Sequence, residues 1–357
     1  MRRPHLSLLF LIGLAVACSR QEPSRPAQDS QPASELVFYN WEGDMPSSVL
    51  DAFTAKHGVK VRYVTFGSQE EAVETIEAGK LVWDVAVVET EYLSRLIRGR
   101  LLAEIDPQGL TNFKNVSPNF RDLAADPGNR HSVPYHFGTT GLLVRTDLLG
   151  DSVKRWADLW KPGFAGRIGV RDSRREVLGF TLVSLGYSFN SENPAELEAA
   201  LKRLREFKKP PVFVEVEAAK AVPKLLGGEV AVLQGWAEDY AMAVEKNKAV
   251  RYVIPEEGCT LWGDHFVVSA RTPNQSAAAR FLDFLLEPEV GALMVNEKKY
   301  ANANEAALPL VKPEIRNDPV IYPPAAQLAK GHYYSTLSEE GERLYADVWS
   351  RFKTTRR

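Results

Sequence analysis

Short apolar runs alternate with helix-length segments along most of this 357-residue sequence, and this alternation limits the possible folds more than any other feature. The run 83–88 (WDVAVV) is almost continuously apolar, as expected of a parallel strand that is covered on both faces. The alternation predicts an α/β fold. Strands are expected at 36–39, 59–64, 83–88, 167–170, 212–216, 229–233, 250–254 and 265–269. Helices are expected at 46–56, 68–78, 92–98, 174–185, 194–207, 218–226, 236–246 and 276–286.

The segment 133–144 (VPYHFGTTGLLV) stands apart from this pattern. It contains two short extended pieces on either side of a break made of Gly and Thr residues. We interpret the segment as a crossing between two lobes. A chain of this length is long enough to form two lobes, each with a hydrophobic core of its own.

The N-terminus has the features of an export signal. Arg2 and Arg3 precede the apolar stretch 6–17, which is too short to span a bilayer and is typical of a signal-peptide core. The stretch ends in LAVAC, and small residues before a cysteine resemble the lipobox of bacterial lipoproteins. We therefore predict a signal peptide at 1–17 and lipidation of Cys18. Ordinary secretion, with Cys18 incidental, is the alternative.

The segment that follows the predicted cleavage site is unsuited to packing. Residues 18–35 are polar, with three prolines and no large apolar side chain, and we expect a disordered tether between lipid and fold. The chain would then be held at a membrane and work in the water outside it. Cys259 is the second of two cysteines, and with Cys18 acylated it is expected to be a buried free thiol.

Charge and composition exclude some classes of function. The formal charge is -2, and removal of Arg2 and Arg3 leaves 42 basic and 46 acidic side chains, a charge of -4. This balance argues against a nucleic-acid binder, which needs a basic face. The six histidines are scattered without the spacing of metal ligands, so we expect neither a metal nor a cofactor.

Acidic and aromatic residues gather where the predicted strands end. Ligands of open α/β sheets bind beyond the carboxyl ends of the strands. Tryptophan rings attract ammonium groups and stack on methylenes, while carboxylates bind ammonium directly. The pattern therefore favours a ligand with an apolar chain and positive ends. The residues are Trp41, Glu42, Asp44, Glu89, Glu91, Asp172, Ser173, Glu176, Trp236, Glu238, Asp239, Trp262 and Asp264.

Each of these signals also has a purely structural explanation. Ser173 and Glu176 have the spacing of a capping box, and spacing alone favours this cap over a ligand contact. The loop acids lie near helix N-termini, where the helix dipole stabilises negative charge. The three tryptophans could be core residues. It is the recurrence of acids and aromatics after successive strands that supports a binding site.

Five stretches of the sequence have the form of known motifs. They are YNWEGD (39–44), PYHFGTTGLLVRTD (134–147), WADLWKP (156–162), GWAEDY (235–240) and YANANEAALPLV (300–311). YANANEAALPLV and GWAEDY are fairly specific, whereas WADLW alone would be weak. Together they make the chain resemble the spermidine/putrescine-binding proteins of bacterial ABC importers, with the putrescine-specific branch the most similar. The resemblance covers nearly all of the chain from about Leu36 onward.

The resemblance implies a two-lobed periplasmic-binding-protein fold of type II, with the ligand in a cleft between the lobes. Lobe 1 would comprise 36–139 and about 265–300, and lobe 2 would comprise 140–264 and about 301–357. It further implies a role for seven residues. Trp41 and Trp236 would stack on the carbon chain, Glu176, Asp239 and Asp264 would bind amines, Trp262 would lie near the ligand, and Tyr300 would close the cleft.

The sequence departs from the family at the rim of the expected cleft. Glu89 stands where the family often has serine, with Glu91 two residues further on, and Glu42 stands where serine or threonine is usual. Ser173 replaces an aspartate of the spermidine branch. A more acidic rim could favour a longer or more highly charged amine, or a different cation.

We therefore expect a monomeric lipoprotein of the periplasm or cell surface that binds a polyamine and delivers it to an ABC permease and its ATPase. Its only membrane contact would be the lipid anchor, and it would not be an enzyme. Three alternatives are open. A hydrolase could use Glu89 and Glu91 as a carboxylate pair, although the sequence contains no nucleophile elbow, metal motif or phosphate loop. A binding protein could feed a sensor. A receptor for another cation or an amino acid could use Arg171, Arg174 or Arg175.

Overall fold

The computed structural model describes residues 34–164, 166–207, 213–216 and 218–354. The predicted signal peptide, the predicted lipidation site at Cys18 and nearly all of the predicted tether lie outside these residues. These described residues group into one compact unit. Within the described residues, no helix is both long enough and apolar enough to cross a bilayer.

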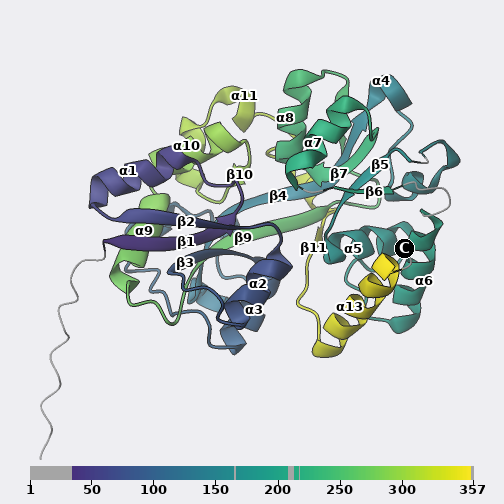
Figure 1. The fold of residues 1–357 in the computed structure, drawn as a ribbon. Coiled ribbons are helices and arrows are strands. Elements are labelled where there is room, and N and C mark those ends of the chain that lie inside the picture. Colours follow the sequence, from purple (N-terminus) through teal and green to yellow (C-terminus); the bar gives the residue numbers. More distant parts are fainter. Residues whose placement is uncertain (1–33, 165, 208–212, 217, 355–357) are drawn as a thin grey trace, which may run out of the picture. The chain divides into compact units, whose positions relative to one another are not determined.

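One mixed sheet organises the described chain, in the order β2-β1-β3-β9-β4-β7-β5-β6. The pairs β1–β2, β1–β3, β5–β6 and β5–β7 are parallel, whereas β9 pairs antiparallel with β3 and β4, and β4 pairs antiparallel with β7. Figure 1 shows β4 and β9 running between the two parallel groups. The strands are β1 (Glu35–Trp41), β2 (Lys60–Phe66), β3 (Val85–Glu89), β4 (Ser132–Arg145), β5 (Ile168–Arg171), β6 (Phe213–Val216), β7 (Val232–Trp236), β8 (Val250–Val253), β9 (Thr260–Val268), β10 (Ala301–Asn302) and β11 (His332–Tyr333).

Helices follow most of these strands, which confirms the predicted α/β alternation. The helices beyond residue 287, among them the long C-terminal helix α13, were not predicted from the sequence. The helices are α1 (Ser47–His57), α2 (Gln69–Glu77), α3 (Thr90–Arg98), α4 (Thr146–Leu149), α5 (Arg174–Ser184), α6 (Pro194–Glu206), α7 (Ala218–Gly227), α8 (Ala237–Lys246), α9 (Gln275–Leu285), α10 (Pro288–Lys298), α11 (Pro313–Arg316), α12 (Ala325–Leu328) and α13 (Glu339–Thr354).

Two large hydrophobic cores flank the central strands. One packs β1, β3 and β9 against α1 and α9, with the ring of Phe281 in contact with those of Phe38 and Phe53. The other packs β5 and β7 against α5, α6 and α13, with Trp156 stacked on Phe180. A core for each of two lobes agrees with the expectation from the sequence, while the lobe boundaries given there stay a prediction.

Three local predictions were wrong. β4 is one continuous 14-residue strand, because its Gly/Thr segment pairs with β9 on one side and β7 on the other instead of forming a break. β7 begins three residues later than expected and includes Trp236. β9 begins at Thr260, so Trp262 and Asp264 lie within the strand and not before it. In each case the pairing of β4 with β7 and β9 overrides the strand limits that the local sequence pattern predicts.

A β-bulge in β4 bears directly on the site. Pro134 pairs with His265 and Phe137 pairs with Gly263, so two residues, Tyr135 and His136, face Asp264 alone. A bulge bends a strand and redirects its side chains. This one directs side chains of β4 toward the end of β1.

Replacement of Gly179 by alanine tests the packing of α5. An added Cβ would lie 2.2 Å from the ring of Phe189, which is buried. We expect Gly179→Ala to lower the free energy of unfolding by about 1–3 kcal/mol, the usual cost of overpacking. Urea unfolding measures the change. Gly227→Ala in α7 is the control, because no atom lies within 4 Å of its added Cβ. Equal stability of the two variants would contradict the prediction.

Candidate cation-binding site

Three tryptophans meet where β1 and β7 end and β9 passes between them in space. The ring centroids of Trp41 and Trp236 are 6.2 Å apart, and those of Trp236 and Trp262 are 6.4 Å apart. The indole Nε1 of Trp41 donates to Asp264 Oδ2 at 3.2 Å. Gly138 is required opposite Trp262, because an added Cβ would lie 2.3 Å from the ring. The structure thus brings together the three tryptophans that the sequence singled out.

A buried histidine, which the sequence did not single out, links the acids of this region. His136 Nε2 lies 3.2 Å from Asp44 Oδ1 and 3.5 Å from Asp264 Oδ2. Burial opposes protonation of His136, but the carboxylates of Asp44 and Asp264 outweigh burial and raise its pKa. The PYHFGTT stretch is the sequence signal that could have located His136. The bulge that directs His136 inward has no signature in the sequence.

Asp44 and Tyr300 are held by protein partners. Asp44 Oδ2 accepts hydrogen bonds from Asn40 Nδ2 at 2.9 Å and from the Tyr135 hydroxyl at 3.0 Å. Burial would raise the pKa of Asp44, yet His136 and these donors lower it. Tyr300 is buried, its hydroxyl bonds that of Tyr135, and its ring lies 4.5 Å from that of His136. Both residues therefore support His136.

Asp239 is likewise engaged within the protein. Its Oδ2 accepts from the backbone N–H of Trp236 at 2.9 Å and pairs with Arg171 Nη2 at 2.5 Å. The guanidinium of Arg171 lies 3.6 Å above the ring of Trp236. The position beside Asp239, where the family resemblance implied an amine, is thus filled by an arginine side chain.

Glu176 is buried in a polar cage and does not close a capping box. Ser173 Oγ accepts from the Glu176 backbone N–H at 3.4 Å, which is half of such a box. The Glu176 carboxylate instead accepts from Thr140 Oγ1 at 2.7 Å, and from Gln234 Nε2 and Thr260 Oγ1 at 3.3 Å. Burial raises its pKa, and the hydrogen bonds from Thr140 and Thr260 offset part of the rise.

Glu89 and Glu91 extend the acidic region beyond Asp264. Glu89 is the register partner of Asp264 across β3 and β9. Burial raises the pKa of Glu89 well above its ordinary value, and the carboxylates of Glu91 and Asp264 raise it further. Burial also raises the pKa of Glu91 to about 7. Glu42, by contrast, is exposed, and no described contact joins its side chain to these acids.

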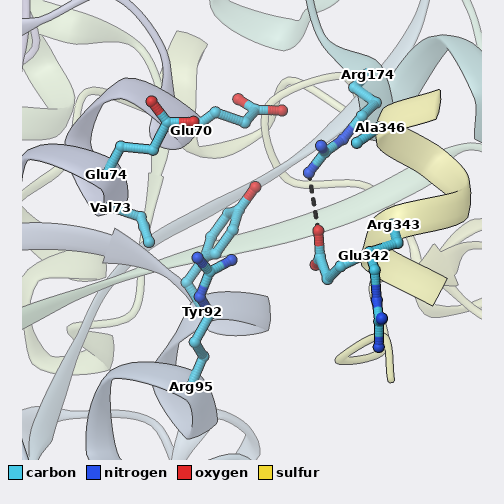
Figure 2. Close-up of a pocket in the computed structure, with 9 residues that line it drawn as sticks. All are labelled: Glu70, Val73, Glu74, Tyr92, Arg95, Arg174, Glu342, Arg343 and Ala346. Atoms are coloured by element: carbon cyan, nitrogen blue, oxygen red, sulfur yellow. Dashed lines mark hydrogen bonds and ion pairs between the residues drawn. The ribbon is translucent and has the colours of Figure 1, made fainter. Parts of the chain in front are cut away.

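A groove of about 240 Å³ lies between α2, α3 and α13, and Tyr92, the residue after Glu91, is part of its lining. Figure 2 shows Glu70 of α2 on one side of it and the ion pair of Arg174 with Glu342 on the other. Tyr92 of α3 lines the groove, and burial together with Glu70, Glu91 and Glu89 raises the pKa of its hydroxyl well above the usual range. The carboxylates of Glu89 and Glu91 thus act electrostatically on a residue of the groove lining.

Several buried carboxylate oxygens have no hydrogen-bond partner among the described residues. They are Glu91 Oε2, Glu238 Oε2 and Asp264 Oδ1. A buried anion without a partner is costly, because burial removes its hydration. Burial raises the pKa of Glu238 to about 7 and that of Asp264 to about 6. The site therefore has unused capacity for positively charged groups.

Two other titratable side chains, those of Cys259 and His265, add no charge to this region. Cys259 is a free, buried thiol whose pKa burial raises to about 12, as expected from the sequence for a structural cysteine. His265, next to Asp264, donates to or accepts from Thr90 Oγ1 at 3.0 Å, and burial lowers its pKa to about 3. The described part of the chain contains no group of His, Cys, Asp and Glu residues that could hold a metal ion.

The raised carboxyl pKa values predict a pH dependence of stability. The folded-state pKa values of Glu91 and Glu238, both about 7, exceed the ordinary value of 4.5. These two carboxyls therefore bind more protons in the folded chain than in the unfolded chain between about pH 4.5 and about 7, and their contribution to the free energy of unfolding falls as the pH rises through this range. His265, whose pKa is lowered to about 3, opposes this change but is a single group. We expect the Tm of the ligand-free protein to fall between about pH 5 and about pH 8.

Thermal unfolding at constant ionic strength measures this slope. Glu91→Gln should flatten it, because the amide does not titrate, whereas Glu289→Gln, at an exposed position, should leave it unchanged. A Glu91→Gln variant with the full wild-type slope would show that Glu91 does not contribute.

Comparisons with known proteins agree with this geometry. A family model described as bacterial extracellular solute-binding protein matches residues 48–323. The spermidine/putrescine-binding periplasmic protein of Escherichia coli (strain K12) is 32% identical over 323 residues, covering 90% of this chain and 92% of that protein. The putrescine/agmatine-binding protein of Pseudomonas aeruginosa is 32% identical over 368 residues, covering 98% and 97%.

A solved structure gives the same result for the fold. The putative spermidine/putrescine ABC transporter from Listeria monocytogenes superposes with a TM-score of 0.86 at 30% identity, covering 91% of this chain and all of that one. The predicted α/β fold of the periplasmic binding proteins and the resemblance to polyamine-binding proteins are thereby confirmed. The chain belongs to the bacterial extracellular solute-binding protein family.

Proposed function

We propose that this protein binds a polyamine of the putrescine/spermidine class and delivers it to an ABC importer. The observation that carries the proposal is the set of buried carboxylates beside the three tryptophans. Asp264 and Glu91 each have an oxygen without a partner among the described residues. Ammonium groups would neutralise these acids, and the methylenes between them would lie against the indole rings. The names of the matched relatives support the same ligand class.

The proposed mechanism is capture without chemistry. The lobes would follow the boundaries predicted from the sequence, with β4 and β9 crossing between them. Contact between Trp41 and Trp236 joins side chains of the two predicted lobes. A closed, empty site would bury unneutralised carboxylates, so a cationic ligand would shift the population toward closure. The closed form would then dock on the permease.

Roles within the site follow from the contacts. Trp41, Trp236 and Trp262 would contact the carbon chain, and Glu89, Glu91, Glu176 and Asp264 would bind amines. Asp44 and Tyr300 would hold His136 in position. Glu42 and Ser173 would belong to the rim. Asp239 has a separate role, which follows from its pairing with Arg171.

The alternative functions have less support. An amino-acid receptor needs a free guanidinium for the ligand's carboxylate, yet the three candidate arginines already have partners. Arg171 pairs with Asp239, Arg174 pairs with Glu342, and Arg175 donates to Asn190 and to the Ser335 carbonyl. For a hydrolase, the matched relatives are named as binding proteins, and we propose that this chain likewise catalyses no reaction.

Calorimetric titration of residues 19–357, refolded from denaturant to remove bound amine, tests the ligand class. We expect one-to-one binding of putrescine or spermidine. Asp264→Asn and Trp41→Ala should each weaken binding at least tenfold, equivalent to about 1.4 kcal/mol. Asp51→Asn, at an exposed position of α1, is the matched control and should bind as wild type. The absence of heat with putrescine, cadaverine, spermidine and spermine would refute the polyamine assignment.

We also propose that Cys18 carries a lipid after removal of residues 1–17, which would place the protein at a membrane facing the periplasm or the outside. Radiolabelled palmitate should be incorporated into the wild-type chain in cells and lost in Cys18→Ala. Cys259→Ala is the matched control, because Cys259 is buried and should not affect labelling. Labelling of Cys18→Ala at the wild-type level would exclude this lipidation site.

A further inference from the structure

Arg171 occupies a position suited to a ligand's ammonium group. It is the last residue of β5, and its backbone N–H donates to Gln234 Oε1 at 2.9 Å. Its guanidinium lies 3.6 Å above the Trp236 ring and pairs with Asp239 at 2.5 Å, and its side chain is 6% exposed. A cation over a tryptophan face and against a carboxylate is the arrangement that an alkylammonium ion would adopt.

A cation tethered to the chain has a strong advantage over a free one. The Arg171 side chain is held next to Asp239 by its own backbone, so its effective concentration there is far above that of any dissolved amine. Asp239 Oδ2 also accepts from the Trp236 backbone N–H, which fixes the carboxylate in place. This subsite is therefore filled before a ligand arrives.

Acids without such partners lie on the other side of Asp264. Glu91 is 8% exposed, and its Oε2 has no hydrogen-bond partner within the described ranges. Glu89 lies in register with Asp264, two residues before Glu91, and the charges that act on it are those of carboxylates. The positive group that acts on Glu91 is Arg175, which already donates to Asn190 and to the Ser335 carbonyl.

We propose that Arg171 serves as a built-in cation at Trp236 and Asp239, so that the second positive group of the ligand binds to Glu89 and Glu91. This inference rests on the proposed polyamine function and specifies which carboxylates bind the ammonium groups of the ligand. The ligand would run from Asp264 toward the groove of Figure 2, where Glu70 offers a further carboxylate. Arg171 is then a specificity-determining residue.

Removal of the built-in cation should open the filled subsite. In Arg171→Met, the Trp236 face and the Asp239 carboxylate become free for an additional ammonium group. We expect calorimetry to show at least a tenfold gain in spermidine affinity over wild type and a smaller gain for putrescine, which has one charge fewer. The double variant Arg171→Met/Asp239→Asn should lose this gain, because the vacated subsite then has no charge. Spermidine binding no tighter in Arg171→Met than in wild type would overturn the role of Arg171.

A second variant tests the other half of the proposal and does not disturb the Arg171 pair. Glu91→Gln should weaken spermidine binding at least tenfold, whereas Glu289→Gln, at an exposed position, should bind as wild type. Wild-type affinity in Glu91→Gln would overturn the placement of the second charge, whether or not Arg171→Met folds. Thermal unfolding without ligand establishes folding for each variant.

The outcomes separate this inference from the proposed function. If wild type binds amines but Arg171→Met and Glu91→Gln match it, the inference fails and the polyamine function stands. If wild type binds no amine, the polyamine function fails. A gain of amine binding by Arg171→Met in that case would still support the role of Arg171.

Discussion

The antiparallel pairing of β4 with β9 is the interaction on which the rest of the structure depends. These two strands join a parallel group of β1, β2 and β3 to a parallel group of β5, β6 and β7. They also carry much of the site, since Thr140 and His136 come from β4 and Thr260, Trp262 and Asp264 come from β9. The bulge within the pair places Tyr135 and His136 opposite Asp264. Scaffold and site are therefore built by the same backbone contacts.

The electrostatics of the site follow from burying more acids than cations. The protein neutralises part of this charge itself, with His136 between Asp44 and Asp264 and with Arg171 on Asp239. It leaves oxygens of Asp264, Glu91 and Glu238 without partners among the described residues. A low-dielectric site with unneutralised anions attracts cations and rejects anions. The paired acids are thus held in place by the protein, and the unpaired acids are the ones that we propose bind the positive groups of the ligand.

The distinction between paired and unpaired acids also separates what the sequence could predict about the site from what it could not. Acids and tryptophans recur at strand ends in the sequence, and the structure does bring Trp41, Trp236 and Trp262 together. Nothing in the sequence distinguishes a free carboxylate from a paired one. Asp239 and Asp264 look equivalent there, yet only Asp239 has an arginine against it. That difference arises from contacts between residues far apart in the chain, such as the 68 positions between Arg171 and Asp239.

By itself, the sequence determined the α/β class and the order of most strands and helices, and its motifs carry the resemblance to polyamine-binding proteins. Local periodicity is enough for the first two, because it acts over a few neighbouring residues. The cationic class of ligand is a prediction from the acids and tryptophans at strand ends. Only the tertiary structure decided that the 133–144 segment is one strand with a bulge, that Glu176 is caged by Thr140 and Thr260, and that Arg171 fills an amine-like position. Strand register and the pairing of buried charges depend on long-range packing, which no local pattern encodes.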